Sequence, residues 1–476
     1  MNRPLRSVSF LVTLLMAALL ANITWLSVVR ADPLNDDPRN RRVREASFSE
    51  NRGTIFVGNT PIAESVATGE TSLPYQRSFA DPTTYSSVTG WYSFNFGSQE
   101  LERSYAQELA GTSSEQAISR IVDILSGRKP QGASLHTSLN ATAQQTAVAA
   151  LGDQQGAVIA MDYTTGEILA LVSTPTYDPN SLASLDFKTE SENWYQLLNA
   201  PTEPLKNRAI REVYPPGSTF KLVTAAAALE AGMAPDTMLA APDKLPLPQS
   251  SSFMANSTNC GGTEITLQQA LETSCNTAFG ALGMQLGADA LRTTAEKFGF
   301  NSEPTIDLPA AKSRFPTELD EAQTALSAIG QFDVAASPLQ MLRVTATIAN
   351  DGVAMRPHVV SNLTGSDLRV LRTNGPQQES RVLDASHARQ LQEMMISVVE
   401  NGTGRPARID GMRIGGKTGT AQSAPDRPPY AWFVGFADKP SVAIAVFVQS
   451  TDAERDEISG GRVAAPIFRA VLKALR

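Results

Sequence analysis

The alternation of hydrophobic and polar positions divides the chain into an apolar N-terminal stretch and a longer globular part. Residues 9–29 are predominantly apolar and uncharged, and Arg3 and Arg6 lie just before them. About 20 such residues suffice to cross a bilayer as a helix. The pattern predicts a cytoplasmic stub and one transmembrane anchor within residues 1–31. Val29-Arg30-Ala31 faintly resembles a signal-peptidase site, so a cleaved signal sequence is the alternative.

The residues that follow this stretch are expected to lie outside the cytoplasm. Residues 32–45 read as a charged linker that contains four arginines. These arginines weaken the charge argument for the orientation, but large domains are translocated regardless of charge. We therefore expect a single-pass protein of the cell membrane, with its N-terminus in the cytoplasm and its globular part outside.

Two globular regions are expected after the linker. Residues 46–138 carry short strand-like runs such as Gly53–Val57, together with helix-like runs at 99–109 and 115–125. This pattern predicts a small, irregular α+β domain without evident chemistry. A tighter pattern begins at residue 139 and continues to the C-terminus at 476.

The larger region has strands at both ends and helices in the middle. Apolar runs at 156–162 and 167–172 flank a turn and predict a hairpin, and runs at 430–437 and 441–448 predict a second one. The intervening patterns are mostly helical, including 270–286 and 321–349, and a helix over 461–475 closes the chain. This order predicts an α+β fold in which one antiparallel sheet is sandwiched by helices.

Composition and motif content argue against several classes of function. The 476 residues carry a net charge of −8, so nucleic acid is an unlikely partner. We find no Cys/His spacing suited to zinc and no phosphate-binding glycine-rich loop, and we expect no metal and no cofactor. The three histidines, His136, His358 and His387, lie near no obvious nucleophile in the sequence. The sequence therefore gives little support for a Ser-His-Asp mechanism.

Ser218 is the first candidate for chemistry. Pro215-Pro216-Gly217 predicts a rigid turn before it, and the apolar run 222–229 predicts a helix after it. Positions three apart share a helical face, so the Ser218 hydroxyl and the Lys221 amine can meet across one turn. A lysine buried near a positive helix end has a lowered pKa, which lets it accept the serine proton.

An ordinary N-cap serine is the alternative for Ser218. A capping box would place Glu or Gln where Lys221 stands, and lysine in a first turn opposes the helix dipole. The chain also has a second Ser-x-x-Lys, at Ser126 and Lys129, in a polar stretch flanked by Gly and Pro. We interpret that match as accidental, and the pattern therefore needs support from elsewhere in the chain.

Two further segments supply candidate groups. Ser274-Cys275-Asn276 lies between two helical stretches, where a hydroxyl and an amide can relay a proton and orient a substrate amide. Gly415-Gly416-Lys417-Thr418-Gly419-Thr420 predicts a glycine-rich strand edge, with Thr418 and Thr420 on one face. Such an edge suits an extended acyl-peptide, and Lys417 adds a positive charge for a carboxylate.

The two cysteines of the chain, Cys260 and Cys275, are fifteen positions apart. Export from the cytoplasm favours a disulfide between them, which would pin the segment around Ser274. Two reduced, buried thiols are the alternative.

The ordered set Ser218-Thr219-Phe220-Lys221, Ser274-Cys275-Asn276 and Lys417-Thr418-Gly419 resembles the motifs of the penicillin-binding proteins. The likeness covers residues 139–476, which the resemblance identifies as a penicillin-binding transpeptidase domain of the penicilloyl-serine transferase fold. Supporting stretches are Asp178–Asn180, Asn207–Ala209 and Gly402–Gly404.

A weaker likeness covers the smaller region. Arg52–Ile55 and the stretch from Thr89 to Glu102 resemble the non-catalytic N-terminal domain of class B members, a dimerisation or pedestal domain assigned here to residues 46–138. The acidic residue and basic pair that commonly follow Arg-Gly-x-Ile are replaced by Val57–Asn59. This departure leaves the role of the smaller domain open.

The resemblance implies a mechanism, residue by residue. Ser218 would attack the penultimate D-alanine of a peptidoglycan stem peptide, and Lys221 would accept its proton. Ser274, linked to Lys417, would pass a proton to the departing D-alanine, while Asn276 holds the substrate amide. The backbone N–H groups of Ser218 and Thr420 would form the oxyanion hole. The strand Thr418, Gly419 and Thr420 would bind the substrate, with both threonines on its terminal carboxylate.

The function implied is a D,D-transpeptidase that cross-links stem peptides and is acylated and inhibited by β-lactams. A class A β-lactamase lacks support, because neither Glu303 nor Glu318 stands in a Glu-x-x-Leu-Asn context. A D,D-carboxypeptidase and a β-lactam-acylated sensor or scaffold stay open as alternatives. Since no room is left for a glycosyltransferase domain, the expected partner is a separate membrane glycosyltransferase of division or elongation.

Overall fold

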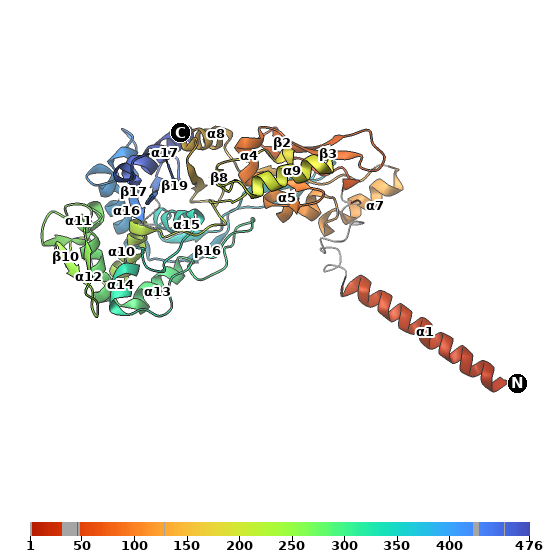
Figure 1. The fold of residues 1–476 in the computed structure, drawn as a ribbon, viewed down its shortest axis with the longest axis horizontal. Helices are drawn as coiled ribbons and strands as arrows, with labels where there is room; N and C mark the ends of the chain where they lie inside the picture. Colours follow the sequence, from red (N-terminus) through yellow and green to blue (C-terminus); the bar gives the residue numbers. More distant parts are fainter. Residues whose placement is uncertain (1, 31–44, 46–47, 128, 422–427, 452) are drawn as a thin grey trace.

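The computed structural model describes residues 2–30, 45, 48–127, 129–421, 428–451 and 453–476. Helix α1 (Asn2–Val28) stands apart from the globular body (Figure 1). Its segment Leu5–Val28 is apolar and long enough to cross a membrane, and none of it is buried against other parts of the protein. These properties fit a membrane anchor and a signal sequence equally.

The smaller region is built on a six-stranded mixed sheet. The strand order is β15-β14-β6-β1-β2-β3, in which β1 and β6 pair in parallel and the other neighbours pair antiparallel. Two of these strands come from residues 360–373, far beyond residue 138. The sheet is therefore shared between the two expected domains. Its strands are β1 (Ile55–Val57), β2 (Thr60–Ala67), β3 (Tyr75–Phe79), β6 (Ser134–Thr137), β14 (Val360–Thr364) and β15 (Val370–Thr373).

Short helices accompany this sheet in the smaller region. They are α4 (Pro82–Thr89), α5 (Glu100–Ser104), α6 (Ala106–Leu109), the 3₁₀ turn η1 (Ser114–Gln116) and α7 (Ala117–Leu125), with the small hairpin β4 (Tyr92–Ser93) and β5 (Gly97–Ser98). The helix expected over 99–109 is two short helices that meet at Tyr105. The longer α9 (Phe187–Leu198), preceded by the turn η2 (Pro179–Ser181), lies beside them in Figure 1.

A buried ionic cluster joins the segments that carry the weaker resemblance. Glu102 receives Arg52 Nε on Oε2 at 2.6 Å and Arg77 Nε on Oε1 at 2.7 Å, and all three side chains are buried. Burial alone would raise the pKa of Glu102, but the charges of Arg77 and Arg52 outweigh burial and lower it. Gly53 must lack a side chain, because a Cβ there would lie 1.9 Å from the Ala133 carbonyl oxygen.

The larger region contains the antiparallel sheet that the hairpins predicted. Its order is β17-β18-β19-β7-β8, and every neighbouring pair is antiparallel. Helices cover both faces, with α8 and α17 on one side and α15 on the other. The bounds are β7 (Gln155–Asp162), β8 (Ile168–Thr174), β17 (Ile414–Ala421), β18 (Tyr430–Ala437), β19 (Val442–Ser450), α8 (Ala141–Leu151), α15 (Pro338–Ala349) and α17 (Ala465–Ala474).

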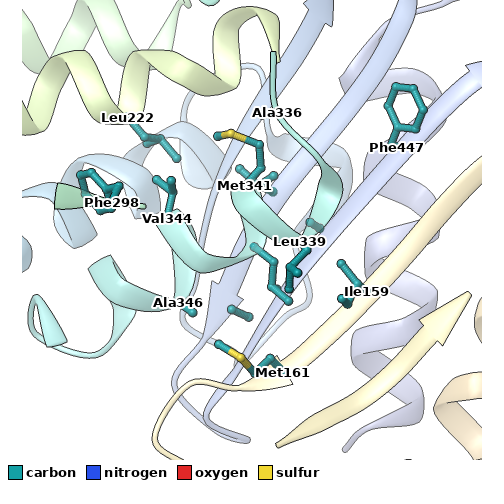
Figure 2. Packing of buried hydrophobic residues seen from close by; sticks show 14 of the residues in the cluster. Ile159, Met161, Leu222, Phe298, Ala336, Leu339, Met341, Val344, Ala346 and Phe447 are labelled. Atoms are coloured by element: carbon teal, nitrogen blue, oxygen red, sulfur yellow. The ribbon is translucent and has the colours of Figure 1, made fainter. Parts of the chain in front are cut away.

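Helix α15 connects the sheet to the helical lobe. Figure 2 shows Leu339 on the side of Ile159 and Phe447, which belong to the sheet, and Val344 on the side of Leu222 and Phe298. All six side chains are nearly inaccessible to solvent and belong to one core cluster. This packing fixes α10 (Lys221–Glu230), which carries Leu222, relative to the sheet.

The helical lobe differs in detail from the expected pattern. The expected helix over 321–349 is α14 (Glu321–Ser327) and α15, separated by a turn at Gly330 and by the cap that Ser337 forms before Pro338. The pattern over 270–286 is interrupted at Ser274, between α11 (Leu267–Glu272) and α12 (Asn276–Leu286). The C-terminal helix begins with one π-helical turn, η6 (Gly460–Ala464), before α17.

The remaining elements of the lobe and its surroundings are short. They are η3 (Gly217–Phe220), β9 (Met238–Ala240), β10 (Lys244–Pro246), β11 (Phe253–Ala255), β12 (Glu264–Thr266), α13 (Ala288–Lys297), β13 (Val353–Met355), β16 (Gln378–Arg381), α16 (Ala385–Glu400), η4 (Arg405–Ala407) and η5 (Arg455–Glu457).

Candidate active site

Ser218 lies in the single 3₁₀ turn η3, directly before α10. The preceding Gly217 has a φ of 53°, in the left-handed region that favours glycine. A Cβ at Gly217 would lie 3.0 Å from the Thr420 carbonyl oxygen, so the turn packs closely against β17. Trp432 of β18 fixes the approach to this turn, because its Nε1 donates to the Pro215 carbonyl at 3.1 Å. Ser218 is thereby held half-buried beside the edge strand.

Lys221 is the first residue of α10 and is completely buried. Its Nζ donates to the Ser274 carbonyl at 2.7 Å, to Ser274 Oγ at 3.3 Å and to Asn276 Oδ1 at 2.8 Å. Burial, reinforced by the positive charge of Lys417, holds the pKa of Lys221 well below its ordinary value. The side chain is therefore suited to accept a proton near neutral pH.

The hydrogen bonds of Lys221 go to the turn between α11 and α12, which we call the Ser274 loop. Among the residues that the structure describes, no hydrogen bond joins Ser218 Oγ to Lys221 Nζ, although they stand one turn apart as expected. Hydrogen bonds to a catalytic group are often long in a protein without substrate and tighten when substrate is bound. In the protein without substrate, the hydrogen bonds to Ser274 and Asn276 fix the position of the Lys221 side chain.

Lys417 lies on β17 and is also completely buried. Its Nζ donates to Ser274 Oγ at 2.8 Å and to the Thr418 carbonyl at 3.1 Å. Burial lowers the pKa of Lys417 to about 7. Ser274 Oγ is thus bound by amines from a helix and from a strand that are almost 200 positions apart in the sequence.

Ser274 is strained in the way that functional residues often are. Its φ is 58°, a left-handed conformation that residues with a side chain rarely adopt. This conformation turns the chain sharply between α11 and α12, so that the Ser274 carbonyl and hydroxyl both reach Lys221. Asn276, the first residue of α12, also donates from Nδ2 to the Ala255 carbonyl at 3.1 Å.

Asn256 positions this loop and was not found by the sequence analysis. Its Oδ1 accepts the backbone N–H groups of Asn276 at 2.8 Å and Thr277 at 3.0 Å, and its Nδ2 donates to Thr277 Oγ1 at 2.9 Å. It therefore caps α12 from a distant segment. The residues directly before Cys260 are mostly polar, and nothing in their pattern distinguishes Asn256 from its neighbours.

Cys260 and Cys275 are joined by a disulfide in the structure, with their Cα atoms 5.4 Å apart. Cys275 stands between Ser274 and Asn276, and its side chain is completely buried. The bond closes the segment that carries Asn256 onto the Ser274 loop. The Ser274 carbonyl and hydroxyl, which both accept hydrogen bonds from Lys221, therefore lie within a covalently closed loop.

Strand β17, which the sequence analysis expects to bind substrate, is at the edge of the five-stranded sheet. Thr418 is buried and its Oγ1 is 2.7 Å from Thr403 Oγ1, whereas Thr420 is exposed. A Cβ at Gly419 would lie 2.9 Å from Thr219 Cγ2, so this glycine lets η3 approach the strand. Thr403 belongs to the Gly402–Gly404 stretch quoted above, but its contact with Thr418 was not predicted.

The histidines and possible metal ligands lie apart from this constellation. His136 is on β6 and His387 is on α16. His358 is buried, and its backbone forms an isolated β-bridge with that of Glu167, directly before β8. Among the described residues, no group of three or more His, Cys, Asp or Glu side chains is arranged to hold a metal ion. The ionisable groups that meet at Ser274 are two lysines.

Comparison with known proteins agrees with this geometry. The model of the penicillin binding protein transpeptidase domain matches residues 156–473, and that of the penicillin binding protein A dimerisation domain matches residues 52–135. The chain is 42% identical to peptidoglycan D,D-transpeptidase PbpA of Mycolicibacterium smegmatis and 41% identical to PbpA of Mycobacterium tuberculosis. In both cases the alignment covers 100% of this chain and 99% of the relative.

Solved structures give the same result. The imipenem acyl-enzyme complex of penicillin-binding protein A from M. tuberculosis superposes with a TM-score of 0.85 at 40% identity, over 90% of this chain and 99% of that one. The penicillin G acyl-enzyme complex of the same protein gives a TM-score of 0.84 at 40% identity, over 90% of this chain and 100% of that one. The overall fold is therefore shared by both structures.

Proposed function

The chain belongs to the penicillin-binding proteins as a peptidoglycan D,D-transpeptidase that β-lactams acylate, and we propose that Ser218 is the residue acylated. The observation that carries the assignment is the convergence of Lys221 and Lys417 on Ser274 Oγ, beside the turn that holds Ser218. The reaction follows from membership of the family, and the roles of the side chains below are proposed from this geometry.

Acylation begins when Ser218 Oγ attacks the carbonyl carbon of the penultimate D-alanine of a stem peptide. Lys221 Nζ accepts the hydroxyl proton, which a neutral amine with a lowered pKa can do. The amide bond to the terminal D-alanine then breaks, and its nitrogen must gain a proton to leave. Ser274 Oγ donates that proton and regains one from the lysines that bind it. A β-lactam opens its ring by the same attack.

The charge that develops on the carbonyl oxygen needs donors. The backbone N–H groups of Ser218 and Thr420 are assigned this role, because η3 and β17 pack against each other at Gly217 and Gly419. Removal of one such donor typically costs roughly 3–4 kcal/mol of transition-state stabilisation. The close packing also explains why both positions exclude side chains.

The edge strand binds the rest of the substrate. Thr418, Gly419 and Thr420 lie alongside the extended peptide, with the threonine hydroxyls on its terminal carboxylate, and Asn276 orients the amide on the opposite side. An amine from a neighbouring stem peptide then attacks the acyl-enzyme, forms the cross-linking amide and returns the proton to Ser218. The substrate class is therefore a peptidoglycan stem peptide that ends in D-Ala-D-Ala.

We further assign α1 as a membrane anchor with its N-terminus in the cytoplasm, which places residues 46–476 outside. Residues 46–138 form a non-catalytic domain and residues 139–476 the transpeptidase domain, with the shared sheet as the connection between them. The chain then depends on a separate membrane glycosyltransferase, of division or of elongation, for its glycan strands.

Mass mapping of the acylated peptide tests the assignment directly. After incubation of the protein with penicillin G and proteolysis, the added mass is expected on the peptide that contains Ser218. The other Ser-x-x-Lys, at Ser126 and Lys129, provides an internal control, because its peptide should stay unmodified. Modification at any serine other than Ser218 would overturn the assignment.

A further inference from the structure

Helix α7 (Ala117–Leu125) lies on the surface of the smaller domain with its apolar side outward. Arg120 turns toward the protein instead, where its Nη2 binds Glu50 Oε1 at 2.9 Å and its Nη1 donates to the Gly111 carbonyl at 3.3 Å. No residue of this helix is buried. Its exposed aliphatic side chains, which we call the α7 apolar face, are Ile118 at 79%, Ile121 at 57%, Val122 at 47%, Ile124 at 59% and Leu125 at 82% exposure.

This arrangement reverses that of an ordinary surface helix, which buries its apolar stripe and exposes its charges. At about 100° per residue, the five side chains form one continuous stripe. Single exposed aliphatic residues are normal, but a contiguous group marks a site of interaction with a protein or a membrane. The ion pair of Arg120 with Glu50 holds the stripe in this orientation.

We propose that the α7 apolar face inserts into the surface of the bilayer to which α1 tethers the chain. This inference rests on the assignment of α1 as a membrane anchor. Glu50, which binds α7 through Arg120, follows the end of α1 at Val28 by 22 positions. A chain of that length spans at most about 75 Å. The α7 apolar face is therefore confined to the neighbourhood of the membrane.

The tether also decides how strong the contact must be. A shallow insertion of a short apolar helix binds a membrane only weakly when the protein is free in solution. When the protein is already attached, the same contact is intramolecular and a weak interaction is sufficient. Figure 1 places α7 and the active-site helix α10 at opposite ends of the globular body. Insertion of α7 would therefore leave the active site accessible.

A second copy of the chain is the competing occupant, because the matching family model calls residues 52–135 a dimerisation domain. Helix α7 has nine residues and is thus about 13 Å long. One face of such a helix falls well short of the roughly 800 Å² per partner that a standard interface buries. A bilayer has no such minimum area, which favours lipid.

Lipid quenching of a fluorescent probe on α7 tests the proposal in the full chain. The variant Ile121→Cys, labelled with a nitrobenzoxadiazole (NBD) probe, is reconstituted into phosphatidylcholine and phosphatidylglycerol vesicles that contain doxyl-labelled lipid. The added thiol is the reactive one, because Cys260 and Cys275 are bonded to each other. The expected result is a blue-shifted emission that the doxyl group quenches. The matched control is Leu198→Cys at the end of α9, also an exposed aliphatic residue, where no quenching is expected.

The outcomes separate the anchor from α7. Flotation of the protein with the vesicles tests α1 alone, and failure to float would overturn both assignments. A floating protein whose probe at position 121 is unquenched would overturn the α7 proposal and leave the anchor standing. A blue shift that grows with protein concentration without lipid quenching would assign the face to a second copy instead.

A second set of variants tests the apolar side chains themselves. With the probe at Ile124→Cys, the changes Ile118→Ser and Leu125→Ser should reduce lipid quenching by severalfold. Penicillin acylation in detergent should be unchanged, which shows that the fold is intact. Quenching that persists at full strength in the serine variant would contradict a role for the stripe.

Discussion

Lys221 and Lys417 donate hydrogen bonds to the same hydroxyl, Ser274 Oγ, at 3.3 Å and 2.8 Å. Two fully buried amines in such proximity cannot both be positively charged without a large electrostatic cost. Burial lowers the pKa of both lysines, and the nearby charge of Lys417 lowers the pKa of Lys221 further. One lysine therefore helps to keep the other available as a base.

The first prediction concerns the pH dependence of acylation by penicillin G. Acylation needs neutral Lys221, so its rate should rise with pH through the pKa of that residue. A positive Lys417 lowers the pKa of Lys221, and Lys417→Met removes that charge. The acidic limb of the rate profile should therefore move to higher pH, and the shift should be largest below about pH 7, where Lys417 is protonated. The rate at neutral pH should fall roughly 100-fold or more.

The control for this prediction is Lys473→Met, which removes an exposed lysine of α17, a helix that packs against α8, β18 and β19. Its profile should match that of the wild-type protein. An acidic limb that stays in place in Lys417→Met would show that the two lysines do not influence each other.

The second prediction concerns the disulfide. Cys275 stands between Ser274 and Asn276, so its bond to Cys260 constrains the two groups that fix Lys221. Closure of a 15-residue loop is expected to contribute about 3 kcal/mol to the free energy of unfolding. The double variant Cys260→Ala/Cys275→Ala should therefore have a lower melting temperature and a lower acylation rate. Dithiothreitol should produce the same changes in the wild-type protein and none in the double variant.

Much of this site could be read from the sequence, because its parts are local. Ser218 and Lys221 are one turn apart, and the hairpins of the sheet follow from alternation around a turn. The contacts between distant segments could not be read in this way. The Asn256 cap, the Thr403 contact with Thr418 and the pairing of β14 with β6 each join positions whose separation carries no periodic signal. The left-handed conformation at residue 274 could not be predicted either, because the residue is a serine and not the glycine that usually indicates such a conformation.

The confirmed family assignment came from three short motifs, and the structure adds what surrounds them. The sequence places a domain boundary at 138, and strands from 360–373 complete the sheet of the smaller domain. Non-local strand pairing is set by tertiary packing and not by the local pattern. The connection between the two domains is therefore broader than a single linker.

The third prediction tests Asn256 as a positioning residue. Asn256→Ala would leave the N–H groups of Asn276 and Thr277 without their acceptor. Loss of a helix cap typically costs about 1 kcal/mol, and the displaced Asn276 should also reduce the acylation rate. Asn256→Asp retains the acceptor and should recover most of the melting temperature. If alanine and aspartate lower it equally, the cap is not what Asn256 supplies.

The fourth prediction concerns Glu102, which neutralises two buried arginines. Glu102→Gln would leave Arg52 and Arg77 next to each other without a counter-charge, and breaking a buried ion pair in this way costs about 3–5 kcal/mol. We expect a marked fall in the melting temperature of the smaller domain. Glu64→Gln, at an exposed position on β2, is the matched control and should change stability by less than about 0.5 kcal/mol.

The acylation rate of the Glu102→Gln protein then reports how the two domains are connected. Of residues 46–138, none that the structure describes contributes a side chain to the proposed active site, but β6 and β1 complete their sheet with β14 and β15. If the shared sheet transmits the disturbance, the second-order rate with penicillin G should fall together with the melting temperature. An unchanged rate at a temperature where the smaller domain has melted would show that the transpeptidase domain is stable without the shared sheet.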